Sequence, residues 1–600
     1  MTEHLLVGLT TVIIVGVGAQ WLAWRLRVPS ILLLLIFGFL AGPVIGILRP
    51  DELLGDLLLP VVSLSVALIL FEGGLSLRIS ELREIGGVVR NLLSVGVIVT
   101  WISGTAAAHF ILKLDFQISI LLGAVIVVTG PTVIIPLLRH VRPVRQVGSI
   151  LKWEGIVIDP IGAMLSVLVF EAILQSGFEQ ATRMAVAGTL KTVIVGGVIG
   201  TLAAFAMVLF LRKFWIPDYL QNPVSLTMVV GAFTAANSFQ PESGLLAVTI
   251  MGVILANQKS VAVKHIIEFK ENLRVLLLSG LFIVLAARLQ VSDLNRVNLA
   301  SLAFLGVLFF FARPASVAVA TIGSELTWRE RLFLAWMAPR GIVAAAVSSV
   351  FALRLTELDH PEAEFLVPLT FMVIVSTVAV YGLTASCVAR WLGVSRANPQ
   401  GVLFVGAHTW AQEIAQALHK EGYEVLLVDT NRQNISRARM AGLPAVHANV
   451  LSQHFSEEVE LGDIRRSVAL TSNDEVNSLV SMQFAEAFSR AEVYQLLAEG
   501  EEEGHKRAAV HHLHGRHLFG PGMTYGALET AFARGAKIKK NRLTEEFDYA
   551  AFRARYGEKA VPLFMLDKDG EISVFTTESK PLPKPGQTLI SLVSDDTEKG

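Results

Sequence analysis

The fold is decided by residues 120–170, which read ILLGAVIVVTGPTVIIPLLRHVRPVRQVGSILKWEGIVIDPIGAMLSVLVF. Two apolar stretches, each long enough to cross a bilayer, flank a short basic loop. Gly130-Pro131 interrupts the first, and a proline inside a helix removes a backbone hydrogen bond and clashes with the preceding turn. The second carries Asp159, and a charge inside a membrane span is costly unless it faces a partner or a cavity. The stretch therefore predicts a broken membrane helix beside a helix with a buried carboxylate.

The composition of the whole chain extends this prediction to about two thirds of its length. Hydrophobic residues make up 53% of the 600 residues and charged residues only 17%, which is too apolar for a soluble protein. The character changes near residues 396–399, beyond which no apolar run could cross a bilayer. We expect a helical membrane domain over 1–395, a Rossmann-like α/β domain over 400–535 and a small β-rich subdomain over 540–600. The net charge of −1 gives no indication of nucleic-acid binding.

Hydropathy and loop charge predict the number of spans and their direction. We expect thirteen spans, near 5–24, 28–48, 57–77, 88–112, 116–138, 153–175, 189–211, 223–239, 241–257, 273–291, 299–321, 331–354 and 364–391. Basic residues gather in alternate loops, as at Arg78, Arg83 and Arg90, and this positive-inside bias places the N-terminus outside and the C-terminal domain in the cytoplasm. The expected location is the plasma membrane, a bacterial inner membrane.

A second interruption lies in the twelfth predicted span, LAWMAPRGIVAAAVSSV, residues 334–350. Pro339 and Gly341 flank Arg340 there, seven spans after the first break, so the two broken helices would cross the membrane in opposite senses. Paired broken helices within inverted repeats are the best sequence indication of a transporter's ion site. Two unrelated proline kinks are the alternative.

Four further charged residues are predicted to lie within the membrane domain. Glu154 comes five residues before Asp159, about 7.5 Å along a helix axis, and better suits a structural partner for a cation such as Arg340. Glu72, at the end of the third span, either reaches the cavity of Asp159 or extends to water. We expect Arg313 to pair with a carboxylate or with carbonyl groups inside the bundle.

A single buried carboxylate that water can reach from either side offers a simple exchange chemistry. A monovalent cation and a proton compete for the same negative charge, and only the neutralised site crosses easily. Hard oxygen ligands favour sodium, lithium or potassium over softer metals, and the sequence does not choose among them.

Four segments resemble the signatures of one transporter family. LFEGGLSL, VTGPTVI, WEGIVIDPIGA and APRGIVAAA are similar to those of the cation:proton antiporter family that includes the archaeal NhaP transporters and the eukaryotic sodium/proton exchangers. The resemblance covers roughly residues 5–392. It implies thirteen spans, a homodimer with a dimerisation domain, a core domain with crossed broken helices, and an elevator-like motion.

The resemblance also assigns roles to residues by motif. The essential aspartate falls on Asp159, the threonine whose backbone helps to bind the ion on Thr129, and the glutamate of the third span on Glu72. The glutamate that pairs with the arginine of the twelfth span falls on Glu154, and that arginine on Arg340.

Three positions depart from the family pattern. Gly130 stands where the family often has aspartate, Ile158 where it has asparagine or a second aspartate, and Gly155 where it often has serine. Because electrogenic relatives carry two aspartates in the sixth span, this chain, with Asp159 alone, is predicted to exchange ions electroneutrally.

The soluble region begins with GVLFVGAHTWAQEIAQALHKEGYEVLLVDTN, residues 401–431. This strand, turn, helix and strand suit a dinucleotide fold, with Gly406 at the phosphate turn and Asp429 placed for ribose hydroxyls. His408 replaces the second glycine of the fingerprint, where backbone must approach a pyrophosphate. With residues 467–485, this region resembles TrkA-N (regulator of potassium conductance) domains, which implies a cytoplasmic regulatory domain. The candidate regulator is NAD(H) or an adenine nucleotide, and the alternative is a fold kept for regulation or dimer contacts alone.

The sequence thus predicts a homodimeric antiporter of Na⁺ or K⁺ and H⁺, not an enzyme, with no required cofactor and no metal beyond the transported cation. A potassium channel or efflux system gated by the soluble domain is the alternative, but no Thr-Val-Gly-Tyr-Gly filter is present. A membrane oxidoreductase is disfavoured because no flavin, haem or iron–sulfur ligation pattern is evident.

Overall fold

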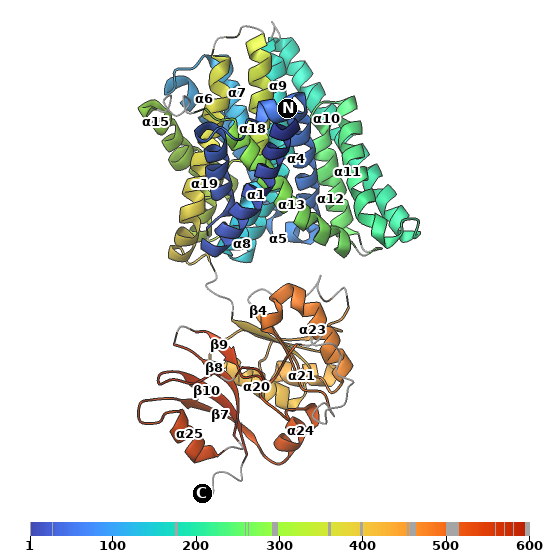
Figure 1. Cartoon of the computed structure of the whole chain (residues 1–600), viewed down its shortest axis with the longest axis vertical. Helices are drawn as coiled ribbons and strands as arrows, with labels where there is room; N and C mark the ends of the chain where they lie inside the picture. Colours follow the sequence, from blue (N-terminus) through green and yellow to red (C-terminus); the bar gives the residue numbers. More distant parts are fainter. Residues whose placement is uncertain are drawn as a thin grey trace. The chain divides into compact units, whose positions relative to one another are not determined.

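In the computed structural model the chain divides into two compact units, Met1–Arg396 and Ala397–Gly600 (Figure 1). The structure describes residues 2–26, 28–174, 178–258, 260–261, 263–290, 298–357, 360, 362–395, 400–452, 455, 464–499, 515–557, 560–568, 570–579 and 581–594. The predicted linker, residues 396–399, lies outside the described residues.

The first unit is helical throughout its described part. Its helices are α1 (Thr2–Leu26), α2 (Ser30–Phe39), η1 (Leu40–Val44), α3 (Pro50–Leu54), η2 (Gly55–Leu57), α4 (Leu58–Leu75), η3 (Ile79–Glu81), α5 (Leu82–Asn91), η4 (Leu92–Gly96), α6 (Val97–Phe110), α7 (Phe116–Val127), α8 (Pro131–Val141), α9 (Arg145–Leu174), α10 (Phe178–Arg212), α11 (Asp218–Phe239), α12 (Ser243–Asn257), α13 (Lys264–Ala287), α15 (Leu299–Val307), η5 (Leu308–Ala312), α16 (Arg313–Ala320), α17 (Trp328–Trp336), α18 (Ile342–Glu357), η6 (Ala363–Phe365) and α19 (Leu366–Trp391).

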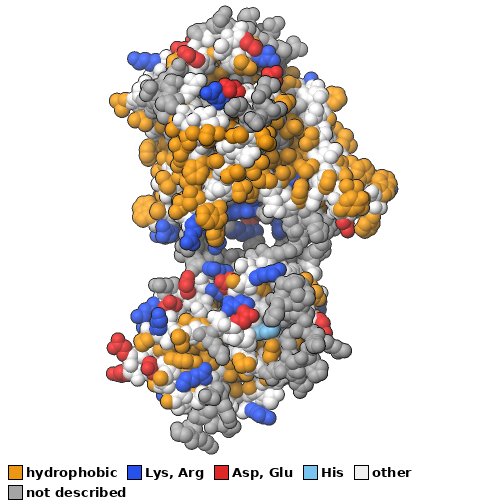
Figure 2. Space-filling model, in the orientation of Figure 1, with side chains coloured by type: hydrophobic (Ala, Val, Ile, Leu, Met, Phe, Trp, Pro, Cys, Tyr) orange, Lys and Arg blue, Asp and Glu red, His pale blue; other side chains and the backbone are white. Residues whose placement is uncertain are grey.

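This unit is a multi-pass membrane domain. Within the described ranges, eight helices are long and apolar enough to cross a bilayer, and three shorter apolar helices accompany them. Figure 2 shows hydrophobic side chains over most of its visible surface, with Lys and Arg side chains along its lower edge. Helix α11 and the α17–α18 pair occupy the two remaining predicted spans without meeting the same criterion, so the count of thirteen stays a prediction.

Two of the predicted spans are broken helices. Helix α7 ends at Val127 and α8 begins at Pro131, which occupies a first-turn position where its missing N–H costs nothing. Helix α17 begins with a capping box between Thr327 and Glu330, and the helical path resumes only at α18. A Cβ on Gly130 would lie 2.6 Å from the Cα of Gly341, so the two breaks meet. The predicted fold class, with crossed broken helices, is confirmed.

The second unit contains a parallel sheet of Rossmann type. Its six strands have the order β3-β2-β1-β4-β5-β6, and every neighbouring pair is parallel. This is the dinucleotide-binding strand order, in which a ligand crevice forms at the carboxyl ends of β1 and β4. The elements of this sheet and its connections are β1 (Gly401–Val405), α20 (Thr409–His419), β2 (Val425–Asp429), α21 (Arg432–Met440), β3 (Ala445–His447), β4 (Ile464–Ala469), α23 (Asp474–Phe488), η7 (Arg490–Glu492), β5 (Val493–Gln495) and β6 (Arg516–His517).

A four-stranded antiparallel sheet, of order β7-β10-β8-β9, completes the unit. Its hydrophobic side chains, including Phe564 and Ile590, lie in one core cluster with Phe404 and Leu427 of the parallel sheet. The two sheets therefore fold around a shared core. The elements are α24 (Tyr525–Ala533), β7 (Lys537–Arg542), α25 (Tyr549–Tyr556), β8 (Val561–Leu566), β9 (Ile572–Val574) and β10 (Thr588–Val593).

Candidate ion-binding site

Asp159 lies in the middle of α9, next to Pro160, and is only 1% exposed. Neither of its carboxylate oxygens accepts a hydrogen bond from any residue that the structure describes. Burying such a group without a partner is strongly unfavourable, so a carboxyl at this position indicates a bound proton or a bound cation.

The face of α9 that carries Asp159 packs against the break between α7 and α8. Gly155 and Gly162 lie one turn before and one turn after Asp159 on the same face. A Cβ on Gly155 would lie 2.8 Å from the Cδ1 of Ile134, and a Cβ on Gly162 would lie 3.4 Å from the Cα of Val128. The two glycines thus bring α9 close to the segment from Val128 to Ile134.

That segment contributes two buried hydroxyl groups. Thr129 is 2% exposed and Thr132 is 3% exposed, and within the described segments neither hydroxyl oxygen has a hydrogen-bond partner. The face of α9 with the unpartnered carboxylate therefore packs against a broken helix that holds two hydroxyl groups without partners among the described residues. Such a set of oxygens can hold a hard cation.

Close backbone contact accounts for glycine at position 130, because a Cβ there would lie 2.6 Å from the Cα of Gly341. At Gly155 a Cβ would meet the Cδ1 of Ile134 at 2.8 Å, which is the end of a flexible side chain and can move aside. The crossing of the two breaks therefore leaves no space for a side chain at Gly130.

The prediction of a Glu154–Arg340 ion pair is wrong. Glu154 pairs instead with Arg313 of α16, whose Nη1 donates to Oε1 and whose Nη2 donates to Oε2 over 2.9 Å. Arg340 Nη1 donates over 3.1 Å to the carbonyl oxygen of Val127, the last residue of α7. A cation there complements the negative end of the half-helix and satisfies a carbonyl that the break leaves open, whereas the buried Nε of Arg340 has no hydrogen-bond partner among the described residues.

Arg313 has the surroundings predicted for it. It is 4% exposed, and in addition to the bidentate contact with Glu154 its Nε donates over 3.0 Å to the carbonyl oxygen of Leu334 in α17. It thereby joins three helices of the bundle, α9, α16 and α17. The sequence indicated this pairing because Arg313 is a single charged residue within an apolar segment.

Glu72 is neutralised by a cation on α13. Its Oε1 lies 2.5 Å from Nη1 of Arg274, and both side chains are buried. Lys270, one turn earlier on α13, is also buried and lies 5.2 Å from the centre of the Phe71 ring. Sequence reasoning did not anticipate either cation, because both fall near the end of a predicted span, where a basic residue usually reaches water.

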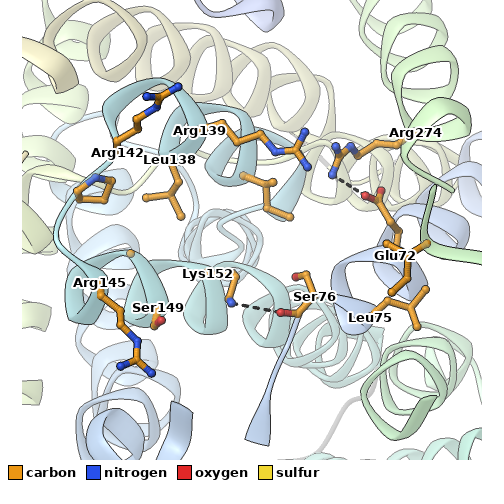
Figure 3. A pocket seen from close by; sticks show the side chains of 14 residues that line it. Glu72, Leu75, Ser76, Leu138, Arg139, Arg142, Arg145, Ser149, Lys152 and Arg274 are labelled. Atoms are coloured by element: carbon orange, nitrogen blue, oxygen red, sulfur yellow. Dashed lines mark hydrogen bonds and ion pairs between the residues drawn. The ribbon is translucent and has the colours of Figure 1, made fainter. Parts of the chain in front are cut away.

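Glu72 lines a pocket of about 450 Å³ between α4, α8, α9 and α13 (Figure 3). The lining residues are Glu72, Leu75, Ser76, Ile135, Leu138, Arg139, Arg142, Pro143, Arg145, Gly148, Ser149, Lys152, Ile267 and Arg274.

The pocket lies on the same face of α9 as Asp159. Ser149, Lys152, Ile156 and Asp159 follow one another at helical spacing, and Lys152 is about 10 Å from Asp159 along the helix axis. Ile156 is fully buried, and a Cβ on Gly73 of α4 would lie 3.3 Å from its Cγ1. Ile156 therefore packs against α4 at a position between Lys152 and Asp159 along α9.

In the soluble unit, both carboxylate oxygens of Asp429, at the end of β2, accept hydrogen bonds from neighbouring segments. Its Oδ2 accepts from the backbone N–H of Ala407 at 2.9 Å and from Nδ2 of Asn434 at 2.9 Å, and its Oδ1 accepts from the N–H of Asn431 at 2.8 Å. Gly406, with a φ of 107°, supplies the positive φ in the turn between β1 and α20 that carries Ala407.

Aromatic side chains fill the space beside that turn. The rings of His408 and Trp410 have centroids 4.2 Å apart, and Tyr525 of α24 lies 5.2 Å from His408. The Cε1 of His408 lies 3.2 Å from the position of a Cβ on Gly406. Burial lowers the pKa of His408 to about 4, so its ring is neutral at pH 7. A pyrophosphate needs bare backbone at this helix N-terminus, and these residues do not fit it.

Residues 9–391 match the family model described as sodium/hydrogen exchanger, transmembrane, and residues 402–511 match the TrkA-N domain model. The chain belongs to the sodium/hydrogen exchanger family. This is a family of transporters and not of enzymes. The chain is 27% identical over 383 residues to the K(+)/H(+) antiporter NhaP of Alkalimonas amylolytica, a match that covers 63% of this chain and 65% of that protein.

Two further similarities come from Methanocaldococcus jannaschii. The chain is 24% identical over 397 residues to its Na(+)/H(+) antiporter 1, covering 64% of this chain and 92% of that protein. The solved structure of its sodium proton antiporter MjNhaP1 at pH 8 superposes with a TM-score of 0.55 and 22% identity, covering 64% of this chain and 96% of that one. The latter similarity shows a shared fold.

Proposed function

We propose that this exchanger carries out secondary antiport of a monovalent cation, Na⁺ or K⁺, against H⁺. One observation carries the proposal: the carboxylate of Asp159 is buried without a partner among the described residues, at the crossing of two broken helices. The two relatives named above are called K(+)/H(+) and Na(+)/H(+) antiporters, which supports this class of substrate.

Asp159 binds either the cation or the proton. The Thr129 and Thr132 hydroxyl groups and the carbonyl groups of the break offer neutral oxygens to the cation. Because a single carboxylate balances a single positive charge, each state of the loaded site is neutral. This charge balance supports electroneutral exchange.

The other charged groups keep the helices in place. Glu154 and Arg313 neutralise each other, and Arg340 caps α7, so neither arginine neutralises Asp159 directly. Access requires that α8 and α9 move relative to α4, which would carry Ile156 away from Gly73 and open the pocket toward Asp159. This is the elevator-like motion that the family resemblance implies.

We place the exchanger in the plasma membrane of a bacterium, as a homodimer with its N-terminus outside and the TrkA-N region in the cytoplasm. The many basic residues of the pocket support this orientation through the positive-inside rule. The soluble unit would regulate exchange. The prediction that NAD(H) or an adenine nucleotide is the regulator stays a prediction, and the packing of His408 argues against binding at the Gly406 turn.

Exchange by reconstituted protein tests the proposed function. Vesicles containing a pH dye receive Na⁺, K⁺ or Li⁺ in turn, with wild type, Asp159→Asn and the matched control Asp115→Asn. Asp115 is an exposed acid at the start of α7. At least one ion should dissipate the proton gradient with wild type and with the control, and none with Asp159→Asn. Undiminished exchange by Asp159→Asn would refute the assignment.

Titration of the full-length protein with NADH and with adenine nucleotides tests the regulator. We expect no saturable binding by wild type. If the His408 side chain blocks the nucleotide site, the His408→Gly variant should bind NADH or an adenine nucleotide. Adding Asp429→Asn to that variant should weaken the binding. Tight binding by wild type would contradict the interpretation of the loop.

A further inference from the structure

Helix α19 contacts all four half-helices of the two breaks. It packs against α7 and α8 of the first broken helix and against α17 and α18 of the second. Three threonines, Thr370, Thr377 and Thr384, follow one another along α19 at seven-residue intervals, so their side chains share one face of the helix. A helix with this row of hydroxyl groups and these four neighbours is in a position to hold the crossing in place.

The three hydroxyl groups differ in their partners. Thr384 Oγ1 accepts over 3.0 Å from Nε1 of Trp336, the last residue of α17. Thr377 Oγ1 accepts over 3.2 Å from the backbone N–H of Arg340, within the second break. Thr370 Oγ1 is buried and has no hydrogen-bond partner among the described residues. The middle threonine of the row thus contacts the backbone of the break.

The hydroxyl group of Thr377 is oriented to accept that bond. The residue is 2% exposed, and its hydroxyl donates over 3.0 Å to the carbonyl oxygen of Ile374, three residues earlier on α19. A hydroxyl group has one hydrogen to donate and two lone pairs, so this bond leaves the lone pairs for the N–H of Arg340. A buried N–H that lost this acceptor would remain unpaired, which is unfavourable.

Arg340 connects this contact to the candidate ion site. Its Nη1 donates over 3.1 Å to the carbonyl oxygen of Val127 at the end of α7, and its backbone continues into Gly341. A Cβ on Gly130 would lie 2.6 Å from the Cα of Gly341, so the two breaks meet backbone to backbone. A displacement of the Arg340 backbone therefore reaches the first break, whose oxygens we propose as cation ligands beside Asp159.

We propose that Thr377 is a positioning residue for cation binding, whose hydroxyl group fixes the backbone of the second break and, through it, the oxygens of the first break. The carboxylate of Asp159 alone can take up a proton, whereas a cation also needs those neutral oxygens. Loss of the Thr377 hydroxyl should therefore weaken cation binding more than proton binding. The effect on cation binding rests on the proposed function, whereas the contact between Thr377 and the break does not.

Four variants of the full-length protein separate this role from a general loss of stability. Thr377→Val replaces the hydroxyl by a methyl group of similar size, and Thr377→Ala removes the hydroxyl without adding a methyl group, in case the first variant does not fold. Thr377→Ser keeps the hydroxyl and should retain the wild-type properties. Thr370→Val is the matched control, because it removes from the same face of α19 a buried hydroxyl that has no partner among the described residues.

Hydrogen exchange at the break is the first measurement. A peptide that contains Arg340 and Gly341 is followed by mass spectrometry in the full-length protein. The amides of this peptide should exchange about threefold faster or more in Thr377→Val and Thr377→Ala than in wild type, since one hydrogen bond is lost. Thr377→Ser and Thr370→Val should exchange at the wild-type rate. Equal exchange rates in all five proteins would overturn the proposed contact.

Ion exchange in vesicles is the second measurement, with Na⁺ and K⁺ as the probes. In Thr377→Val the half-saturating concentration of the transported cation should rise by about threefold to tenfold, the effect of one lost hydrogen bond, with a smaller change in the maximal rate per folded protein. Because a more weakly bound cation competes less well with protons, the pH of half-maximal exchange at a fixed cation concentration should also rise. Thr377→Ser and Thr370→Val should resemble wild type in both respects.

The outcomes separate the positioning role from the proposed function. An unchanged half-saturating concentration in Thr377→Val, or an equal rise in Thr370→Val, would overturn the positioning role while the antiport function stands. A lower maximal rate without a change in half-saturation would also overturn it, because Thr377 would then support folding alone. If wild type exchanges neither Na⁺ nor K⁺, the antiport function fails together with the effect on cation binding, and hydrogen exchange still decides the contact with the break.

Discussion

Asp159 in the membrane unit and Asp429 in the soluble unit both lie where the sequence predicts a ligand. Their carboxylates differ in whether they accept hydrogen bonds from the protein. Asp429 accepts hydrogen bonds from Ala407 in the turn after β1 and from Asn431 and Asn434 directly after β2. Asp159 is 1% exposed and accepts none from the described parts of the chain. The carboxylate of Asp429 has hydrogen-bond partners within the protein, whereas that of Asp159 has none among the described residues, which supports our proposal that it binds the transported ion.

The same contrast separates Asp159 from its neighbour Glu154. Both are buried acids on α9, but Glu154 is neutralised by two contacts from Arg313. Of these two carboxylates, Glu154 has a structural partner, and Asp159 is the one that we propose for exchange. The predictions below alter the partners of these groups, beginning with the largest expected effect.

Removing the partner of Glu154 should produce the greatest loss of stability. Arg313→Met leaves a buried carboxylate unpaired, which costs about 3–5 kcal/mol, and thermal unfolding of the purified protein should show a large fall in melting temperature. The double variant Glu154→Gln/Arg313→Met should recover much of it. If Arg340→Met lowers the melting temperature to this extent and Arg313→Met does not, Glu154 pairs with Arg340 and our assignment of Arg313 as its partner is wrong.

Crowding the crossing should cost less. Gly130→Ala places a Cβ against the backbone of Gly341, and overpacking of this kind costs about 1–3 kcal/mol. Gly197→Ala is the matched control, because a Cβ on that membrane-helix glycine meets nothing within 4 Å. Thermal unfolding of the two variants should therefore differ. Equal melting temperatures would show that there is room for a second acid at the crossing.

The two aspartates should respond oppositely to a neutral isostere. Asp429→Asn replaces an acceptor by a donor within a set of three hydrogen bonds and should destabilise the soluble unit by about 1–2 kcal/mol. Asp159→Asn removes an unpartnered charge and should not lower the melting temperature. A loss of stability at Asp159 like that at Asp429 would mean that its carboxylate has a structural partner.

The smallest effect concerns pH. The pKa of His408 is lowered to about 4 from an ordinary value near 6.5, so the unfolded chain binds a proton between these values and the folded chain does not. Local stability around α20 should therefore be full above about pH 6.5 and decrease as the pH falls toward 4. Hydrogen exchange of the full-length protein, corrected for intrinsic rates, should show this decrease in wild type and not in His408→Phe.

Much of the fold could be predicted from the sequence, because membrane spans, helix breaks at proline and the β-α-β order each depend on local sequence patterns. The partner of Glu154 could not be predicted. Arg313 and Arg340 both lie in apolar segments distant from Glu154 in the sequence, and only the packing of the helices decides which of them contacts it. The Arg274 contact of Glu72 was missed for the same reason. The reason for glycine at position 130 could not be predicted either, because the sequence does not show that Gly341 packs against it.

Proton release on cation binding tests the central claim most directly. Calorimetric titration of the full-length protein with Na⁺ and with K⁺, in two buffers of different ionisation enthalpy near pH 7, measures the protons displaced. Competition for one carboxyl predicts about one proton released per cation bound by wild type, and neither binding nor release by Asp159→Asn. Cation binding without proton release, or release that persists in Asp159→Asn, would contradict the account.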